Sequence, residues 1–253
     1  MYVFRRCGLY VEELIDACIL FFRFIGHLFC SIIDLLLGKL SISWFKIIKT
    51  IYYSGAKLAI PLMFINTFIG ISIIMKLHAI LAPYNLEHEV RLIAQNILTR
   101  DVVPFLIGVL LCIQSALNLI NDRVDDLFNM PQQVVVNHIL PIIVGINIAG
   151  VLLYTYTITA FFLSIYITFQ YILVVSQHVN FMSITGDIRL FDMIYSILRT
   201  SLYCTIVSVT IGYYYYEVVI SGRSSLRQGV SRIMTRGILW LALCGVCFNY
   251  LAL

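Results

Sequence analysis

A succession of long apolar segments without charged residues constrains this chain more than any other feature. Val102–Ile120 and Ile139–Val175 are both uncharged throughout. A helix that spans the hydrocarbon core of a bilayer needs about 20 mostly apolar residues. Since every backbone polar group in lipid must be bonded within the structure, such segments predict membrane-spanning helices. We therefore predict an all-α integral membrane protein.

The composition agrees with a membrane environment. Hydrophobic residues make up 61% of the 253 residues and charged residues 12%, with a mean hydropathy of +0.95. A soluble domain carries roughly 25% charged residues. The length predicts one domain. The net charge of +4 is small and its basic residues are scattered, which argues against a nucleic-acid partner.

Five segments are predicted to span the membrane. They are Leu58–Met75, Val102–Ile120, Ile139–Val175, Met193–Ile220 and Gly237–Leu253. The third is too long for one span, so it is either one long helix or two spans joined by a tight turn. A single span leaves most Lys and Arg residues on one side, as the positive-inside rule requires. We therefore predict five spans, a cytoplasmic N-terminus and a C-terminus on the opposite side.

The first 57 residues are apolar but contain many charges. Charged side chains divide Leu9–Gly55 into pieces that are each too short to span. We expect residues 1–57 to form interfacial, or elbow, helices and residues 58–253 to form the transmembrane core; the alternative is a first span with buried charges. In the fourth span we expect Arg199 and Glu217, near its ends, to snorkel or to face an aqueous cavity.

A polar segment, Asn121-Asp122-Arg123-Val124-Asp125-Asp126-Leu127, separates the second and third spans. It is either a solvated loop, a short amphipathic helix that docks into a partner protein, or a metal–diphosphate site. The last interpretation arises because NDxxD places two carboxylates about one helical turn apart, where Mg²⁺ binds. The motif resembles the first aspartate-rich motif of UbiA-type prenyltransferases. A second such motif has no convincing match, and the chain has too few spans for that fold.

Segments in a fixed order along the chain resemble the MlaE/YrbE family of permeases. Tyr52-Tyr53-Ser54-Gly55, followed by Phe68-Ile69-Gly70, resembles the entry into the family's first span. Arg100-Asp101-Val102-Val103-Pro104 resembles its R-E-L-G-P, and Asn121–Leu127 is similar to T-E-Q-[IL]-D-A-L, the signature of its coupling helix. Gly229–Arg236 resembles G-[VI]-x-R-A-T-T-R before the last span. The order and spacing together indicate a diverged member of this family.

The chain departs from the family pattern in two places. Leu111–Ala116 stands where the family has a Gly/Ala-rich stretch, which puts close helix approach at that point in question. After the coupling segment the family has arginines, whereas Met130–Gln133 and Asn137-His138 contain none. These departures leave open a non-transporting membrane scaffold as a further alternative, beside the UbiA-like prenyltransferase.

The resemblance implies a permease subunit of an ABC transporter in the bacterial inner membrane, with a periplasmic C-terminus. Such a permease moves phospholipid between the membrane and an MCE-type lipid carrier. Its implied partners are a separate ABC ATPase below the coupling helix, around residues 121–131, an MCE-domain protein, and a second copy of the permease. The chain would perform no covalent chemistry and hold no cofactor or metal, with ATP and Mg²⁺ bound by the partner ATPase.

The resemblance also implies site residues, none of them catalytic. Arg100, Asp101, Arg232 and Arg236 are implied to contact lipid. Anchoring at the membrane edge is the competing role for the first two. The other two, four residues apart on one helical face, are equally well explained by positive-inside anchoring or by partner carboxylates. The residues expected to contact the ATPase are Asp122, Asp125, Asp126, Leu127 and Phe128.

Overall fold

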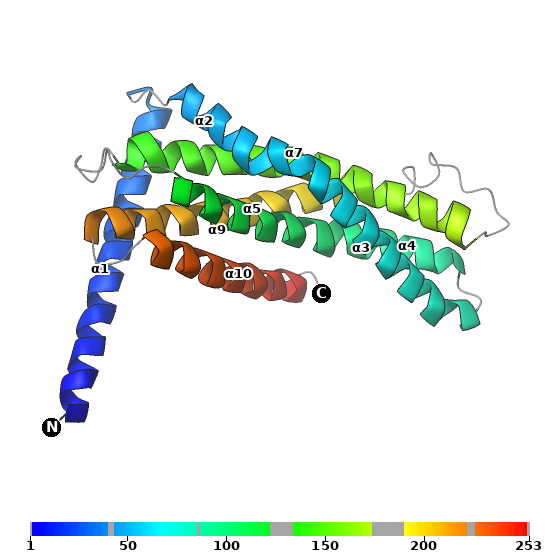
Figure 1. Ribbon diagram of the computed structural model, residues 1–253, viewed down its shortest axis with the longest axis horizontal. Helices are drawn as coiled ribbons and strands as arrows, with labels where there is room; N and C mark the ends of the chain where they lie inside the picture. The colour runs from blue at the N-terminus through cyan, green and yellow to red at the C-terminus, as the bar shows by residue number, and fades with distance from the viewer. Residues whose placement is uncertain are drawn as a thin grey trace.

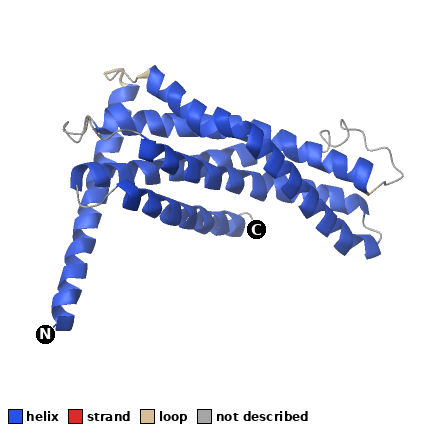
Figure 2. Cartoon of the chain, in the orientation of Figure 1, coloured by secondary structure: helices blue, strands red, loops and turns tan. Residues whose placement is uncertain are grey.

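The protein is described by a computed structural model covering residues 2–39, 43–84, 87–121, 134–173, 190–221 and 226–251. Every regular element in these ranges is a helix, which confirms the predicted all-α fold (Figure 2). The α-helices are α1 (Tyr2–Leu36), α2 (Trp44–Ile51), α3 (Lys57–Leu81), α4 (Glu87–Ile97), α5 (Val103–Asn121), α7 (Leu140–Ile167), α9 (Leu190–Ser221) and α10 (Leu226–Leu251). A 3₁₀ turn, η2 (Ala82–Tyr84), follows α3, and the π-helical segments are η1 (Tyr52–Ala56), η3 (Leu98–Val102), η5 (Val135–Ile139) and η6 (Thr168–Ile172).

Within the described residues, six helical stretches are long and apolar enough to cross a membrane. They are Ile15–Leu35, Trp44–Leu81, Leu92–Leu119, Val135–Ile172, Phe191–Ile220 and Arg227–Tyr250. The last five overlap the five predicted spans. Together they form the bundle of long, roughly aligned helices in Figure 1.

The remaining stretch belongs to α1, which differs from the predicted short pieces. Its charged residues do not interrupt it, and it runs as one helix from Tyr2 to Leu36. Figure 1 shows α1 crossing one end of the bundle at a steep angle to the other long helices. If the bundle stands along the membrane normal, α1 lies nearer to the membrane plane than the others do. Its interfacial location stays a prediction.

The segment expected to be one long span or two is a single helical stretch. Through η5, α7 and η6 it runs without a break from Val135 to Ile172, which confirms the one-helix interpretation. Its 38 residues correspond to about 57 Å at 1.5 Å per residue, against roughly 30 Å of hydrocarbon. The stretch Trp44–Leu81 is equally long. Both helices must therefore tilt or project beyond the hydrocarbon. The stretch Trp44–Leu81 also passes without a break through the predicted boundary at residue 57.

The helices α3 and α7 pack side by side and run in the same direction. Gly145 of α7 lies against Thr50 of α2, and Gly70 of α3 lies against Ser164 of α7. The contacting positions advance together along both helices, which requires a parallel pair. A Cβ added at Gly145 would lie 2.8 Å from Thr50 Cβ, closer than carbon atoms approach in real proteins. The glycines therefore permit a close seam, as small residues do between membrane helices.

The helix α9 packs against α5, α7 and α10. Gly150 of α7 fits against the thiol of Cys204 of α9, and Gly237 of α10 fits against the thiol of Cys112 of α5. A Cβ added at Gly237 would lie 2.6 Å from Cys112 Sγ. Because α10 supplies the glycine, α5 makes a close contact there without a Gly/Ala-rich stretch of its own.

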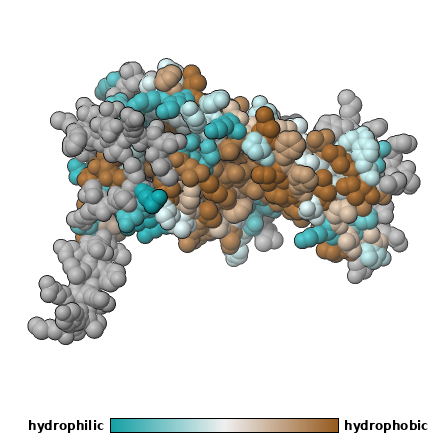
Figure 3. All heavy atoms as spheres, viewed as in Figure 1, coloured by the Kyte–Doolittle hydropathy of each residue, from teal (hydrophilic) through white to brown (hydrophobic). Residues whose placement is uncertain are grey.

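Apolar side chains cover much of the outer surface of the bundle. Figure 3 shows them over the middle of the visible face, with hydrophilic side chains gathered toward its ends. Phe64 and Phe68 of α3, Leu202 of α9 and Val246 of α10 are all exposed. Such a surface is unfavourable in water and favourable in lipid. The bundle therefore has the surface of a membrane-embedded protein.

Candidate functional site

The predicted lipid-contacting residues lie at two separate places along α9. Arg100 and Asp101 belong to η3, which packs near the beginning of α9, where Asp101 bonds Arg199. Arg236 contacts Tyr214, toward the end of the same helix. The stretch of α9 from Arg199 to Tyr214 is about 22 Å long at 1.5 Å per residue. The structure therefore does not bring the predicted residues together into one site within a single chain.

Arg199 is the centre of the first cluster, and it is buried, with 4% of its surface exposed. Its Nη1 donates hydrogen bonds to Asp101 Oδ1 and, at 3.0 Å, to the carbonyl oxygen of Arg100. Nη2 donates to Asn249 Oδ1 at 2.9 Å, and Nε donates to the hydroxyl oxygen of Tyr203 at 3.2 Å. The expectation that Arg199 snorkels or faces an aqueous cavity is wrong, because the chain itself supplies its partners.

This cluster joins three elements of the bundle. The guanidinium of α9 bonds the π segment η3 before α5 and the C-terminal part of α10. A charged group inside a membrane span is stable only with such partners. The Asp101 side chain remains 45% exposed, so one side of the ion pair faces the surroundings. The arrangement fixes where η3 sits and holds one carboxylate at the rim.

Arg100, the neighbouring predicted residue, lies over an aromatic ring of α9. Its guanidinium carbon is 4.8 Å from the centroid of the Tyr195 ring, within the range of a cation–π interaction. Next to it, the hydroxyl of Ser196 donates a hydrogen bond of 2.6 Å to the carbonyl oxygen of Thr99. Arg100 and Asp101 are thus both positioned by α9, and Arg100 stays partly exposed.

Arg232 and Arg236 both contact α9, as expected for residues four apart on one helical face. Arg232 Nη1 lies 3.0 Å from Glu217 Oε1 in an ion pair whose arginine side chain is 46% exposed. Arg236 donates a hydrogen bond of 2.8 Å to the hydroxyl of Tyr214, and its guanidinium lies 5.8 Å from the centroid of that ring. These contacts tie the start of α10 to the end of α9.

The predicted coupling residues lie outside the described residues. They are Asp122, Asp125, Asp126, Leu127 and Phe128. The described chain stops at Asn121, the last residue of α5, and resumes at Val134, just before η5. Both positions lie at the end of the bundle that α1 crosses (Figure 1). The role of these residues stays a prediction.

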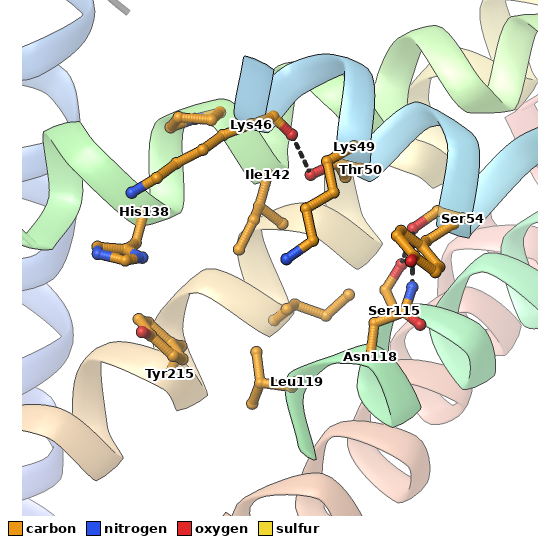
Figure 4. A pocket seen from close by; sticks show the side chains of 13 residues that line it. Lys46, Lys49, Thr50, Ser54, Ser115, Asn118, Leu119, His138, Ile142 and Tyr215 are labelled. Carbon is orange, nitrogen blue, oxygen red and sulfur yellow. Dashed lines mark hydrogen bonds between the residues drawn. The ribbon is translucent and has the colours of Figure 1, made fainter. Parts of the chain in front are cut away.

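A cavity of about 530 Å³ opens at this same end of the bundle. It lies between α2 with η1, the last turns of α5, the start of α7 with η5, and α9 (Figure 4). Its lining residues are Lys46, Lys49, Thr50, Tyr53, Ser54, Ser115, Asn118, Leu119, His138, Pro141, Ile142, Ile211 and Tyr215. Its volume falls within the range of small-molecule sites, about 300–1,000 Å³.

Polar contacts hold the walls of the cavity together. Lys46 Nζ donates a hydrogen bond of 3.0 Å to the carbonyl oxygen of Asn137, which links α2 to η5. On the opposite side, the hydroxyls of Ser54 and Ser115 lie 3.4 Å apart, and Asn118 Nδ2 donates to Ser54 Oγ at 3.4 Å. In Figure 4 the Lys49 side chain extends into the middle of the cavity. No single motif marks this site, because its residues come from four separate segments, and only Tyr53 and Ser54 belong to a motif singled out in the sequence.

Two of the π segments form walls of this cavity. Tyr53 and Ser54 belong to η1, and His138 belongs to η5. Segments of π-helix within α-helices occur frequently at functional sites. Asn137, whose carbonyl accepts the Lys46 bond, also belongs to η5.

A buried amide lies on α3, within the core. Asn66 has no exposed surface, and neither Nδ2 nor Oδ1 has a hydrogen-bond partner. The Thr157 hydroxyl of α7 is likewise buried without a partner. Unpaired polar groups of this kind are rare in protein interiors.

The described residues contain no group of three or more His, Cys, Asp or Glu side chains that could hold a metal ion.

Comparison with known protein families identifies the family of this chain. The profile of the family described as Permease MlaE matches residues 47–253, which include α3, α5, α7, α9 and α10. Among curated proteins, no significant match is found. The family match covers well over half of the chain and begins within α2, one residue after Lys46. The chain therefore belongs to the MlaE permease family.

Proposed function

We propose that this protein is the permease subunit of an ABC transporter that moves phospholipid between the bacterial inner membrane and an MCE-type carrier protein. A separate ATPase supplies the energy, and a second copy of the chain completes the permease. Closure of the ATPase pair on ATP would draw the coupling segments of the two copies together and change the access of the lipid path. This is rigid-body alternating access, driven from one end of the bundle.

The family match over residues 47–253 carries this proposal. Membership in a permease family supports a role as a membrane subunit of a transporter rather than as an enzyme. The helical bundle with an apolar outer surface is compatible with that role. The phospholipid cargo, the MCE partner, the dimer and the inner-membrane location are the parts that need an experiment.

The decisive experiment is co-purification of the tagged protein from its own membranes in a mild detergent. Proteins and lipids that remain bound are identified by mass spectrometry. An Asp125→Lys variant reverses a charge in the predicted coupling segment, and Asp187→Lys makes the same change in a loop predicted to lie on the opposite side. We expect the native chain to retain an ABC ATPase, an MCE-domain protein and phospholipid. Asp125→Lys should lose the ATPase, while Asp187→Lys should keep it.

Two results would contradict the proposal. An ATPase retained equally by both variants would mean that residues 121–131 are not the coupling segment. A chain that purifies alone and binds Mg²⁺ with a prenyl diphosphate would replace the transporter by the prenyltransferase alternative. In that case the carboxylates of Asp122 and Asp125 would be expected at the metal.

The predicted orientation has its own test. Lys76 is exposed and directly follows the predicted span Leu58–Met75, and Ser43 is exposed just before α2. In a background without cysteines, a membrane-impermeant maleimide added outside intact spheroplasts should label a Lys76→Cys variant. A Ser43→Cys variant should be labelled only after the membrane is permeabilised. Reversed labelling would invert the predicted topology.

A further inference from the structure

The cavity at the end of the bundle that α1 crosses is not part of either predicted lipid-contacting pair, and its lining is basic. Lys46 and Lys49 both contribute to it, and no carboxylate is among the described residues that line it. Hydroxyl groups, an amide and His138 add further polar atoms. Ammonium and hydroxyl donors around a hollow favour an anion with several acceptor oxygens, such as a phosphate.

The polar lining is accompanied by an apolar one. Leu119 of α5, Pro141 and Ile142 of α7, and Ile211 of α9 also line the cavity. Figure 4 shows Lys49 directed between Ile142 and Leu119. A small inorganic anion would not make favourable contacts with these apolar groups. A molecule with both a phosphate and an apolar part would contact both kinds of wall.

The position of the cavity also matches a lipid headgroup. The lysines belong to α2, the helix that directly precedes the first core helix and lies beside the end that α1 crosses. Lys49 and Tyr53 are exposed, so the cavity opens at the surface of α2 and η1. Lysine and tyrosine side chains are typical of the level where a membrane meets water. A lipid in the surrounding leaflet therefore has direct access.

We propose that this cavity binds the phosphate of an anionic phospholipid headgroup, with Lys46 and Lys49 as the cationic contacts and the aliphatic wall against the glycerol and first acyl carbons. This inference rests on the proposed function, because it identifies where a phospholipid from the leaflet at the α1 end would contact the permease. Binding of the lipid can still be measured without any transport activity.

The test measures binding of short-chain lipids to the purified full-length protein in detergent by native mass spectrometry. The probes are dioctanoyl phosphatidylglycerol, dioctanoylglycerol, which lacks the phosphate, and glycerol 3-phosphate, which lacks the chains. The variants are Lys49→Gln alone and Lys46→Gln with Lys49→Gln. Lys57→Gln is the matched control, because Lys57 is exposed on the same helical stretch and does not line the cavity.

We expect phosphatidylglycerol to bind best, and its Kd to rise on the order of tenfold in the double variant, since two charge-assisted contacts are lost. Lys49→Gln should give a smaller rise and Lys57→Gln none. Lys46→Gln retains a donor for the Asn137 carbonyl, and size-exclusion chromatography checks that each variant is intact. An unchanged Kd in the double variant would overturn the proposal, as would an equal rise in Lys57→Gln.

The probes separate the possible ligands. Equal binding of dioctanoylglycerol would show an apolar hollow without phosphate recognition. Binding of glycerol 3-phosphate as tight as that of phosphatidylglycerol would overturn the lipid and leave a soluble phosphate compound as the ligand. Co-purification of the ATPase with the double variant is a separate result. If the ATPase stays bound while lipid binding is unaffected, only the cavity inference fails; if no ATPase binds the native chain, the transporter proposal fails instead.

Discussion

The two ends of α9 handle charge in opposite ways. Near its start, Arg199 is buried and bonded to acceptors from η3 and α10. Near its end, Arg232 and Glu217 form an ion pair whose arginine side chain is exposed and whose carboxylate is partly exposed, and Lys49 projects into an open cavity. The first arrangement satisfies a charge inside the chain and so fixes the structure. The second keeps charged groups at or near the surface, where water can solvate them.

This difference has a physical basis in solvent access. A buried charge depends on its partners, because no water replaces a partner that is removed. An exposed charge is solvated whether or not its partner is present, and salt screens it. We therefore expect the ion pair near the start of α9 to contribute much to the free energy of unfolding, and the ion pair near its end to contribute little. Four substitutions test this contrast, in order of decreasing effect.

The largest effect is expected for Asp101→Ala. It removes the carboxylate from a buried guanidinium, and breaking such a pair costs about 3 kcal/mol. Arg199→Met should cost less, because the carboxylate left behind is 45% exposed and can be hydrated. Thermal unfolding in detergent, followed by fluorescence-detected size-exclusion chromatography, measures both. Adding Asp101→Ala to Arg199→Met should cause little further loss, and a simple sum of the two losses would mean that the residues are not coupled.

A smaller loss is expected for Gly150→Ala, between the two ends. The added methyl group would overlap the thiol of Cys204, and overpacking of this kind costs about 2 kcal/mol. Cys204→Ala removes the sulfur, and a Cβ at position 150 would then lie 3.4 Å from the Cβ of residue 204, an ordinary contact. The double variant should therefore regain most of the lost thermal stability.

The matched control for this substitution is Gly26→Ala in α1. Nothing lies within 4 Å of a Cβ at that position, and alanine favours a helix over glycine by about 1 kcal/mol. Its unfolding temperature should stay the same or rise. If Gly150→Ala alone leaves the unfolding temperature unchanged, the close contact between α7 and α9 at this position does not contribute to the stability of the bundle.

A gain in stability is expected for Asn66→Leu. Both polar atoms of this amide are buried without partners, and an isosteric apolar side chain removes that penalty, for a gain of about 1 kcal/mol. Asn147→Leu is the control, because Asn147 donates to the carbonyl oxygen of Ile143 and accepts from Thr205. The control should lose stability in the same thermal assay. A loss in both would mean that Asn66 has a partner, such as a bound water.

Much of the fold was predictable from the sequence, because the signal lies in uninterrupted apolar length. The segment 139–175 could be assigned to one span from the charge distribution alone, and the structure confirms one continuous helical stretch as far as Ile172. The continuity of α1 and of α2 into α3 was not predicted, since charges such as Asp34 and Lys49 suggest breaks. A helix tolerates such charges where the side chains reach the surface, and here Lys49 is exposed and Asp34 partly exposed.

The site was less predictable than the fold. Arg199 is recognisable in the sequence as a lone arginine in an apolar run. Its burial was not predictable, because its partners Asp101 and Asn249 come from distant segments. The cavity combines α2, α5, α7 and α9, so no local pattern marks it. The family resemblance identified the class of protein from short motifs. It gave no indication that Arg232 and Arg236 bond within the chain to Glu217 and Tyr214.

The smallest effect is expected for Arg232→Gln, which completes the contrast between the two ends. This substitution breaks an ion pair as Asp101→Ala does, but the arginine side chain is 46% exposed. Exposed pairs contribute about 0.2–1 kcal/mol, and raising the NaCl concentration should abolish even that difference from the native chain. Thermal unfolding at low and high salt measures it. If Arg232→Gln destabilises the protein as much as Asp101→Ala at high salt, then its pair is structural too, and exposure does not separate the two ends of α9.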